Sequence, residues 1–265
     1  MRSVSGSIVS VQVGGIAPLG PKGVPSGFIK RPVNEPVMAG RFGLAGDRQA
    51  DRRVHGGPDK AVYCYPVEHY ASWRTVVPQH VALLVPGGLG ENLTTEGLDE
   101  DDVAIGDTFR IGRATAQVTQ PRQPCFKLAL RFEDPQMVKA MVRSGFSGWY
   151  LRVLDAGQIR AGTPITLIDR PNPAWSITRF NQSTRVMERW KNWPSSRISQ
   201  GSRTTGERPL ALHSLLPQRI IQSSLPPRHP VHCRRMTRPC GFRRSDNGKT
   251  QRFNVVHPRR LYHVH

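Results

Sequence analysis

The composition of the chain changes near residue 181, and this change limits how much of its 265 residues can fold. Residues 1–180 contain 21 Lys and Arg against 16 Asp and Glu, a net charge of +5, whereas residues 181–265 contain 17 against 3, a net charge of +14. The later segment is rich in Ser, Pro and His and has no sustained helix or strand period. Its apolar surface is too small to offset the ~1–2 kcal/mol of backbone entropy that folding costs per residue. We therefore expect a folded domain over 1–172, followed by an irregular, disordered basic tail over 173–265.

Two other interpretations of the tail remain open. A cation-rich segment is typical of arms that bind RNA or DNA, so nucleic-acid binding is one alternative. The other is a frameshift. The peptide WKNWP, at 190–194, is encoded by TGG-AAR-AAY-TGG-CCN. Read one frame over, the same bases give the codons NTG-GAA-RAA-YTG-GCC, which encode (Leu/Met/Val)-Glu-(Glu/Lys)-Leu-Ala. That second peptide favours a helix and the first does not. We hypothesise a frameshifted tail in place of a small helical segment, and a gene with no helical reading frame past codon 181 or so would rule this out.

Several classes of protein are disfavoured by the sequence. No run of about 18 apolar residues is present, so we expect neither a membrane-spanning helix nor a membrane partner. The first stretch, MRSVSGSIVSVQVGG, lacks the unbroken apolar run of a secretory signal, and we therefore expect a cytoplasmic protein. The cysteines form neither a disulfide framework nor a paired CxxC zinc motif. They are Cys64, Cys125, Cys233 and Cys240.

Residues 1–172 show the patterns of a β-rich domain. Alternation of apolar and polar residues predicts strands over 5–13 and 163–170, and a hairpin over 106–120 that turns at Gly112. Short strands separated by many Gly and Pro turns are typical of a barrel or a sandwich. The expected fold class is therefore α+β, mostly β, with a β-barrel and a few flanking helices.

Two of those helices are marked by their ends. The segment 133–145 has Asp134 to cap it, Pro135 in its first turn and Gly145 to end it. The segment 66–77 also begins at a proline, and it places apolar side chains on one side. These side chains are Tyr70, Trp73 and Val77.

One cysteine has unusual neighbours. In TQPRQPCFKL, Cys125 follows two prolines and has Arg122 and Lys127 close by in sequence. Cations lower the pKa of a thiol toward the reactive thiolate, and prolines hold the backbone in place. A thiolate of this kind attacks a substrate, is oxidised or binds a metal, and this stretch alone does not choose between these roles.

Two other peptides combine glycine turns with polar residues that a core does not need. In VHGGPDKAV, Gly56 and Gly57 allow an anion to approach the backbone closely, and Lys60 adds a positive charge. A solvated turn with a cationic rim is the alternative interpretation. In GENLTT, Asn92 is either a ligand contact or an ordinary turn former.

Taken together, GDRQADRRVHGGPDKAV, GENLTTEGL and QPRQPCFKL resemble the MOSC domain proteins, and within them the YiiM type. The resemblance runs from about residue 5 to 180. It implies a MOSC-type β-barrel that binds the molybdenum cofactor, a phosphorylated pterin dithiolene (molybdopterin), with Cys125 as the protein ligand to molybdenum. It also implies reduction of N-hydroxylated compounds, 6-hydroxylaminopurine being the typical substrate. Proteins of this type end in a small helical segment, and this chain departs from that pattern after RPNPAWSITRFN.

The resemblance suggests roles for individual residues. Cations and bare backbone suit the cofactor's phosphate, and the residues that we expect to bind the cofactor, with Cys125, are Lys60, Arg122, Lys127, Gly56 and Gly57. Hydrogen-bond or proton partners are needed near the metal, and the catalytic residues that we expect there, again with Cys125, are His55, Asp59 and Asn92.

The function that follows is a molybdenum-dependent oxidoreductase that detoxifies N-hydroxylated bases. The chain has no GxGxxG motif and no cluster-type set of cysteines, so we expect electrons from a separate reductase, a flavoprotein or an iron–sulfur protein. Two alternatives remain. One is a sulfur carrier that holds a persulfide on Cys125, and the other is a basic protein that binds nucleic acid through its tail.

Overall fold

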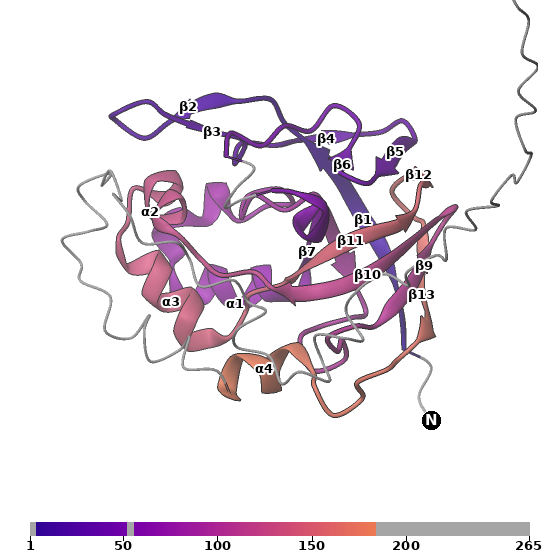
Figure 1. The fold of residues 1–265 in the computed structure, drawn as a ribbon. Coiled ribbons are helices and arrows are strands. Elements are labelled where there is room, and N and C mark those ends of the chain that lie inside the picture. The colour runs from indigo at the N-terminus through magenta and orange to yellow at the C-terminus, as the bar shows by residue number, and fades with distance from the viewer. Residues whose placement is uncertain (1–3, 52–55, 184–265) are drawn as a thin grey trace, which may run out of the picture. The chain divides into compact units, whose positions relative to one another are not determined.

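The structure is a computed structural model that describes residues 4–51 and 56–183 (Figure 1). The tail beyond residue 183, with its three interpretations, lies outside the described residues, and His55 lies outside them too. The strands are β1 (Ser5–Val13), β2 (Ala17–Leu19), β3 (Val24–Ser26), β4 (Arg31–Val33), β5 (Val37–Gly40), β6 (Gly43–Leu44), β7 (Val62–Pro66), β8 (Leu93–Glu96), β9 (Thr108–Ile111), β10 (Ala114–Pro121), β11 (Trp149–Asp155), β12 (Gly157–Ile159) and β13 (Pro164–Asp169). The helices are α1 (Glu68–Val76), α2 (Phe126–Phe132), α3 (Gln136–Ser144) and α4 (Ile177–Ser183), with short 3-10 turns η1 (Pro58–Lys60) and η2 (Pro78–Leu83).

Seven strands close into a barrel in the order β1, β8, β7, β11, β10, β9, β13, because β13 pairs back onto the start of β1. Neighbouring strands are antiparallel except β7 and β8, which are parallel. A parallel pair cannot be joined by a tight hairpin, and the crossover that it needs contains α1 and η2. The expected mostly-β barrel with a few helices is confirmed.

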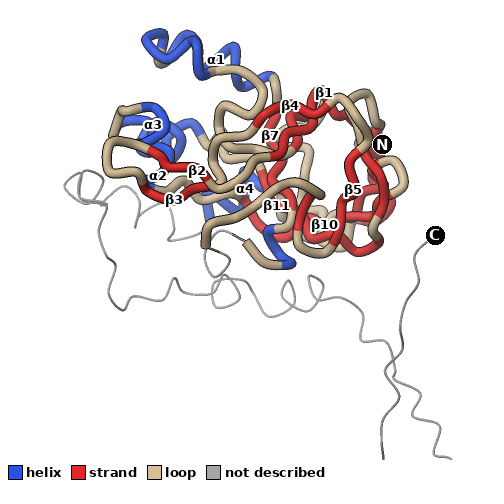
Figure 2. The backbone as a smooth tube through the Cα atoms, turned by 90° about the horizontal axis from the view of Figure 1, so that it is seen from above, coloured by secondary structure: helices blue, strands red, loops and turns tan. Residues whose placement is uncertain are grey.

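Two apolar clusters fill the fold, one inside the barrel and one outside it. Alternation along β7 sends Cys64 into the barrel, whereas Tyr63 and Tyr65 belong to the outer cluster. The outer cluster packs apolar side chains of α1, α2 and α3 against this face of β7. The three helices therefore gather on one side of the molecule (Figure 1), and Figure 2 shows α1 and α3 away from β5 and β10.

The strands and helices predicted from end signals and alternation are present. Helix α3 begins after Asp134, whose Oδ1 accepts the Gln136 N–H at 2.7 Å, and ends at Gly145 with φ of 75°. Helix α1 buries Tyr70 and Trp73, as expected. The hairpin of β9 and β10 turns at Gly112, whose φ of 58° suits glycine.

The described chain continues past residue 172. Helix α4 adds Ile177 and Phe180 to the cluster inside the barrel, and Ser176 forms a bridge with Ala104. The domain boundary placed at residue 172 stays a prediction. None of the described helices is long and apolar enough to cross a membrane.

Candidate functional site

A cavity of about 640 Å³, including its open mouth, lies on the outer face of the barrel. Its walls come from β7, β11, the start of α2, the loops that follow β3 and β6, and the loop before β8. We call it the Cys125 cavity. Five cationic residues and one acidic residue line it, and these are Lys30, Arg48, Lys60, Arg122, Lys127 and Asp47. The excess of positive charge suits an anionic ligand.

Arg122 is the most deeply buried of these cations, with 5% of its surface exposed. Its guanidinium lies 5.2 Å from the centre of the Tyr63 ring and 5.7 Å from that of Phe28, and Nη1 donates to the Met141 sulfur at 3.0 Å. Burial disfavours the charge, but Tyr63, Tyr150 and Cys125 outweigh it, so the pKa of Arg122 is raised. Within the described residues, no carboxylate forms an ion pair with it. A buried guanidinium in this position favours an anion from outside the chain.

Cys125 is the residue from which α2 begins, and its backbone is extended, with φ of −134° and ψ of 175°. The side chain is half-buried on the cavity wall. A negative charge on its sulfur stabilises the charged forms of Lys60 and Arg122. This attraction is mutual, so the two cations also favour the thiolate, which is the form that attacks or binds metals.

Lys60 ends the short turn η1, and its backbone N–H donates to the Gly57 carbonyl at 3.1 Å. Burial lowers the pKa of Lys60, while Asp59 and Cys125 oppose that shift. Gly57 has φ of 91°, a conformation that suits glycine. Lys60 lines the cavity, but Gly56, Gly57 and Asp59 are not among its lining residues.

Asp59, which we expected near the metal, is engaged elsewhere. Its Oδ1 accepts from the Arg152 guanidinium at 2.7 Å, and half of its side chain is exposed. The VHGGPDKAV peptide therefore contributes one cation to the cavity and places the neighbouring carboxylate in a separate ion pair.

Asn92 lines the cavity, and its side-chain amide is hydrogen bonded within the chain. Oδ1 accepts the Tyr63 N–H at 3.1 Å, and Nδ2 donates to Asp47 Oδ2 at 2.9 Å. The other oxygen of Asp47 accepts from Lys30 Nζ at 2.5 Å, and both of these side chains are buried. Asn92 thus links β7 to Asp47 and holds Lys30 at the cavity wall.

Glu91, next to Asn92, was not among the predicted site residues, and it stabilises the loop before β8. The side chain is fully buried and accepts four hydrogen bonds. The donors are the Tyr70 and Thr94 hydroxyls and the backbone N–H groups of Gly87 and Leu89. These bonds account for a carboxylate within the GENLTT peptide.

Tyr63 and Tyr150 also line the cavity and were not predicted. They face each other in the β7–β11 pairing, with ring centres 5.3 Å apart. Burial raises the pKa of Tyr150, and the nearby Arg122 opposes that shift. Alternation in VYCYP and WYLRV is the signal that could have identified both, since it turns the cysteine and tryptophan inward and these tyrosines outward.

Five of the predicted site residues therefore line one cavity. They are Cys125, Lys60, Arg122, Lys127 and Asn92. Lys127 Nζ also donates to the Pro25 carbonyl at 3.3 Å. In the described part of the chain, no three His, Cys, Asp or Glu side chains converge as a complete metal site.

Comparison with known proteins agrees with this architecture. The MOSC domain matches residues 51–166. Protein YiiM of Escherichia coli (strain K12) is 43% identical over 150 residues, which cover 57% of this chain and 67% of that protein. Uncharacterized protein YflK of Bacillus subtilis (strain 168) is 42% identical over 161 residues, which cover 61% of this chain and 72% of that protein. A protein named Reductase from Gibberella moniliformis is 37% identical over 164 residues, but these cover only 29% of it.

Solved structures show the same relationship. The crystal structure of YiiM from Geobacillus stearothermophilus matches with a TM-score of 0.56 and 38% identity, over 67% of this chain and 82% of that one. The crystal structure of YiiM from Escherichia coli matches with a TM-score of 0.52 and 35% identity, over 63% of this chain and 76% of that one. The chain belongs to the MOSC domain family and is of the YiiM type.

Proposed function

We propose that the protein binds the molybdenum cofactor in the Cys125 cavity and reduces N-hydroxylated compounds, with 6-hydroxylaminopurine as a substrate. The observation that carries this proposal is the combination of Cys125 with the buried Arg122, which has no carboxylate partner among the described residues, on one cavity wall. Membership of the MOSC domain family supports a role connected with this cofactor, and a relative named Reductase supports redox chemistry.

The residues present fit the charge of this cofactor. Its phosphate needs fixed cations, and Arg122, Lys60 and Lys127 lie on the wall. A charge-assisted hydrogen bond contributes about 1.5–3 kcal/mol, and Arg122 would gain most because it is the most buried. Cys125 would supply one soft thiolate ligand, while the cofactor carries its own dithiolene sulfurs.

The bound cofactor would supply the two-electron removal of oxygen, in which an N–OH group, two electrons and two protons give an N–H group and water. The chain's part is to bind and orient. Phe28, Tyr63 and Tyr150 supply aromatic side chains to the cavity wall, against which the base of the substrate would pack. Electrons would come from a separate reductase.

The direct test is an assay of protein purified from a host that makes the cofactor. With a reduced viologen dye as the electron donor, we expect 6-hydroxylaminopurine to be converted to adenine at a rate proportional to the molybdenum content. Protein from a host that lacks the cofactor is the control, and equal rates in the two preparations would contradict the proposal. Absence of molybdenum together with one extra, thiol-removable sulfur on Cys125 would favour the sulfur carrier instead.

A further inference from the structure

The segment 146–148, between α3 and β11, accepts hydrogen bonds from three residues in or next to the wall of the Cys125 cavity. Its three carbonyls accept, in chain order, the Tyr65 hydroxyl at 3.3 Å, the Tyr63 hydroxyl at 3.0 Å and the Arg122 backbone N–H at 3.2 Å. Tyr63 and Arg122 both line the cavity. The position of this segment therefore helps to set where the buried guanidinium lies.

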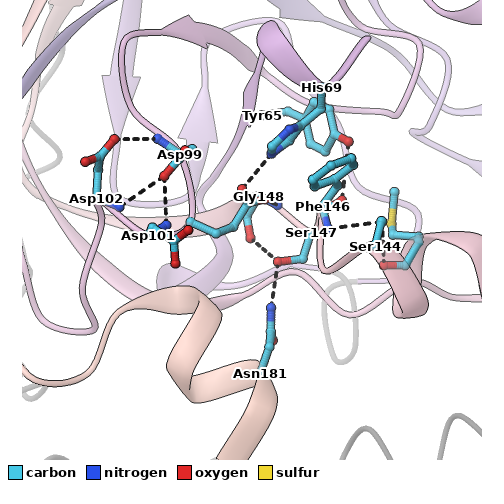
Figure 3. A network of polar contacts seen from close by, with 12 residues as sticks. Tyr65, His69, Asp99, Asp101, Asp102, Ser144, Phe146, Ser147, Gly148 and Asn181 are labelled. Carbon is cyan, nitrogen blue, oxygen red and sulfur yellow. Dashed lines mark hydrogen bonds and ion pairs between the residues drawn. The ribbon is translucent and has the colours of Figure 1, made fainter. Parts of the chain in front are cut away.

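The opposite side of the segment rests on a buried acid–imidazole pair of Glu100 and His69, and Figure 3 labels His69 next to Phe146. Glu100 Oε1 accepts the Gly148 N–H at 2.7 Å, and Oε2 lies 2.6 Å from His69 Nε2. The His69 ring stacks on Phe146, with centroids 3.9 Å apart and planes 13° from parallel. Glu100 and His69 are only 4% and 8% exposed, so this pair is part of the interior.

The loop that carries Glu100 is itself ordered by its acidic neighbours. Asp99 Oδ1 accepts the N–H groups of Asp101 at 2.8 Å and Asp102 at 3.1 Å (Figure 3). On the far side, Asn181 of α4 donates to the Ser147 hydroxyl at 3.1 Å. The segment is thus anchored from the α1 side, from the acidic turn and from α4.

Gly148 leaves little room for the segment to move toward the barrel. Its φ is 61°, and a Cβ there would lie 2.2 Å from the Cys64 carbonyl oxygen and 3.0 Å from the Tyr63 ring. Real Cβ atoms do not approach backbone oxygen so closely. A shift of the segment would therefore be passed on to β7 and its tyrosines.

We propose that Glu100 and His69 are positioning residues for the anion site: they fix the segment 146–148, which holds Tyr63 and the Arg122 backbone in place. Neither residue lines the Cys125 cavity. The inference rests on the proposed function only in that Arg122 acts as an anion-binding group there. It predicts that geometry, and not the charge of Glu100, is what the site requires.

The test uses Cys125 itself as the reporter on the full-length protein. The rate of its alkylation by the anionic reagent iodoacetate, divided by that for neutral iodoacetamide, measures the positive potential at the thiol. Mass spectrometry of the Cys125 peptide separates it from the other cysteines. Cofactor is not needed, so an absence of molybdenum or reductase activity would refute the proposed function and leave this result interpretable.

Glu100→Gln removes the charge but keeps an oxygen for the Gly148 N–H and a donor for the imidazole, whereas Glu100→Ala removes both contacts. Loss of a nearby negative charge by itself raises the preference of Cys125 for iodoacetate, so the rate ratio of Glu100→Gln should equal or exceed that of the parent. Displacement of Arg122 acts in the opposite direction, and we expect the ratio of Glu100→Ala to be about threefold or more below that of Glu100→Gln. A ratio for Glu100→Ala equal to or above that for Glu100→Gln would overturn the proposal.

Asp107→Ala is the matched control for simple loss of stability. Asp107 is also fully buried, pairs with Arg170 at 2.7 Å and does not line the cavity. The thermal stability of Asp107→Ala is expected to fall while its alkylation ratio stays at the parent value. A fall in the ratio of Asp107→Ala like that of Glu100→Ala would show that the effect is merely structural.

If Glu100→Ala does not fold, His69→Leu is compared with the parent instead. An unchanged alkylation ratio in His69→Leu would overturn the proposal.

Discussion

Two cavities in the described part of the chain are each bordered by a cysteine, and they differ in almost everything else. The small cavity inside the barrel is lined by Cys64 with apolar side chains and a single hydroxyl, that of Thr95. The Cys125 cavity outside the barrel has five cations on its wall and an open mouth. Cys64 lies on β7, and the neighbouring Tyr63 reaches the other cavity, so one strand supplies a wall to both.

The difference shows that surroundings decide what a thiol can do. Burial raises the pKa of Cys64 far above its ordinary value, and Glu91 adds to the shift. That thiol stays protonated and behaves as a small apolar side chain. Cys125 instead interacts with Lys60 and Arg122, and it is only half-buried. The comparison assigns chemistry to Cys125 and packing to Cys64.

The largest expected effect tests this assignment. Cys125→Ser should retain the fold and lose reductase activity by at least about 100-fold, because a hydroxyl is a harder donor and stays protonated at neutral pH. Rates are measured per folded molecule on preparations of known molybdenum content. Cys64→Ala is the matched variant and should keep the parent rate. Equal activity in Cys125→Ser and the parent would remove the central role of this thiol.

A smaller effect is expected from the cation that lies deepest in the cavity. Arg122→Met should lower cofactor occupancy about tenfold or more, since a charge-assisted contact contributes about 1.5–3 kcal/mol. Turnover per bound molybdenum should change less. Arg179→Met is the control, because Arg179 is exposed and stacks on Trp175 away from the cavity. Full occupancy with poor turnover in Arg122→Met would move this residue from anchoring to catalysis.

The smallest effect concerns the cavity inside the barrel. The Thr95 hydroxyl is fully buried and, within the described residues, is the one buried side-chain polar atom with no hydrogen-bond partner. Thr95→Val replaces it by a methyl group of similar shape and should stabilise the fold by about 1 kcal/mol. Urea unfolding measures this change, and cofactor occupancy should not move. A loss of stability would mean that the hydroxyl has a partner in the folded protein, such as an internal water molecule.

Local patterns in the sequence predicted the elements whose signals are local. Asp134 and Gly145 mark the ends of α3, and Gly112 marks the turn between β9 and β10. Helix α2 was not predicted. It is only seven residues long and begins directly after Cys125 without a side-chain cap. Its position against α3 comes from packing, which a short window of sequence does not contain.

The candidate site could be predicted in part, through its short motifs. Cys125, Arg122 and Lys60 are recognisable from their neighbours in the sequence. Tyr63 and Tyr150 are not, because they are far apart in sequence and meet only through the register of β7 with β11. Phe28 reaches the cavity from another loop, packed against Gly90, where a Cβ would lie 3.2 Å from its ring. Such contacts depend on the closed barrel.

The most direct test of the central claim is the molybdenum content of the parent protein, purified from a host that makes the cofactor. The account predicts stoichiometric molybdenum, accompanied by the fluorescence of oxidised pterin after denaturation. It also predicts that occupancy falls sharply in Arg122→Met and not in Arg179→Met. Protein that folds, keeps its charged cavity and contains neither molybdenum nor pterin would contradict the account.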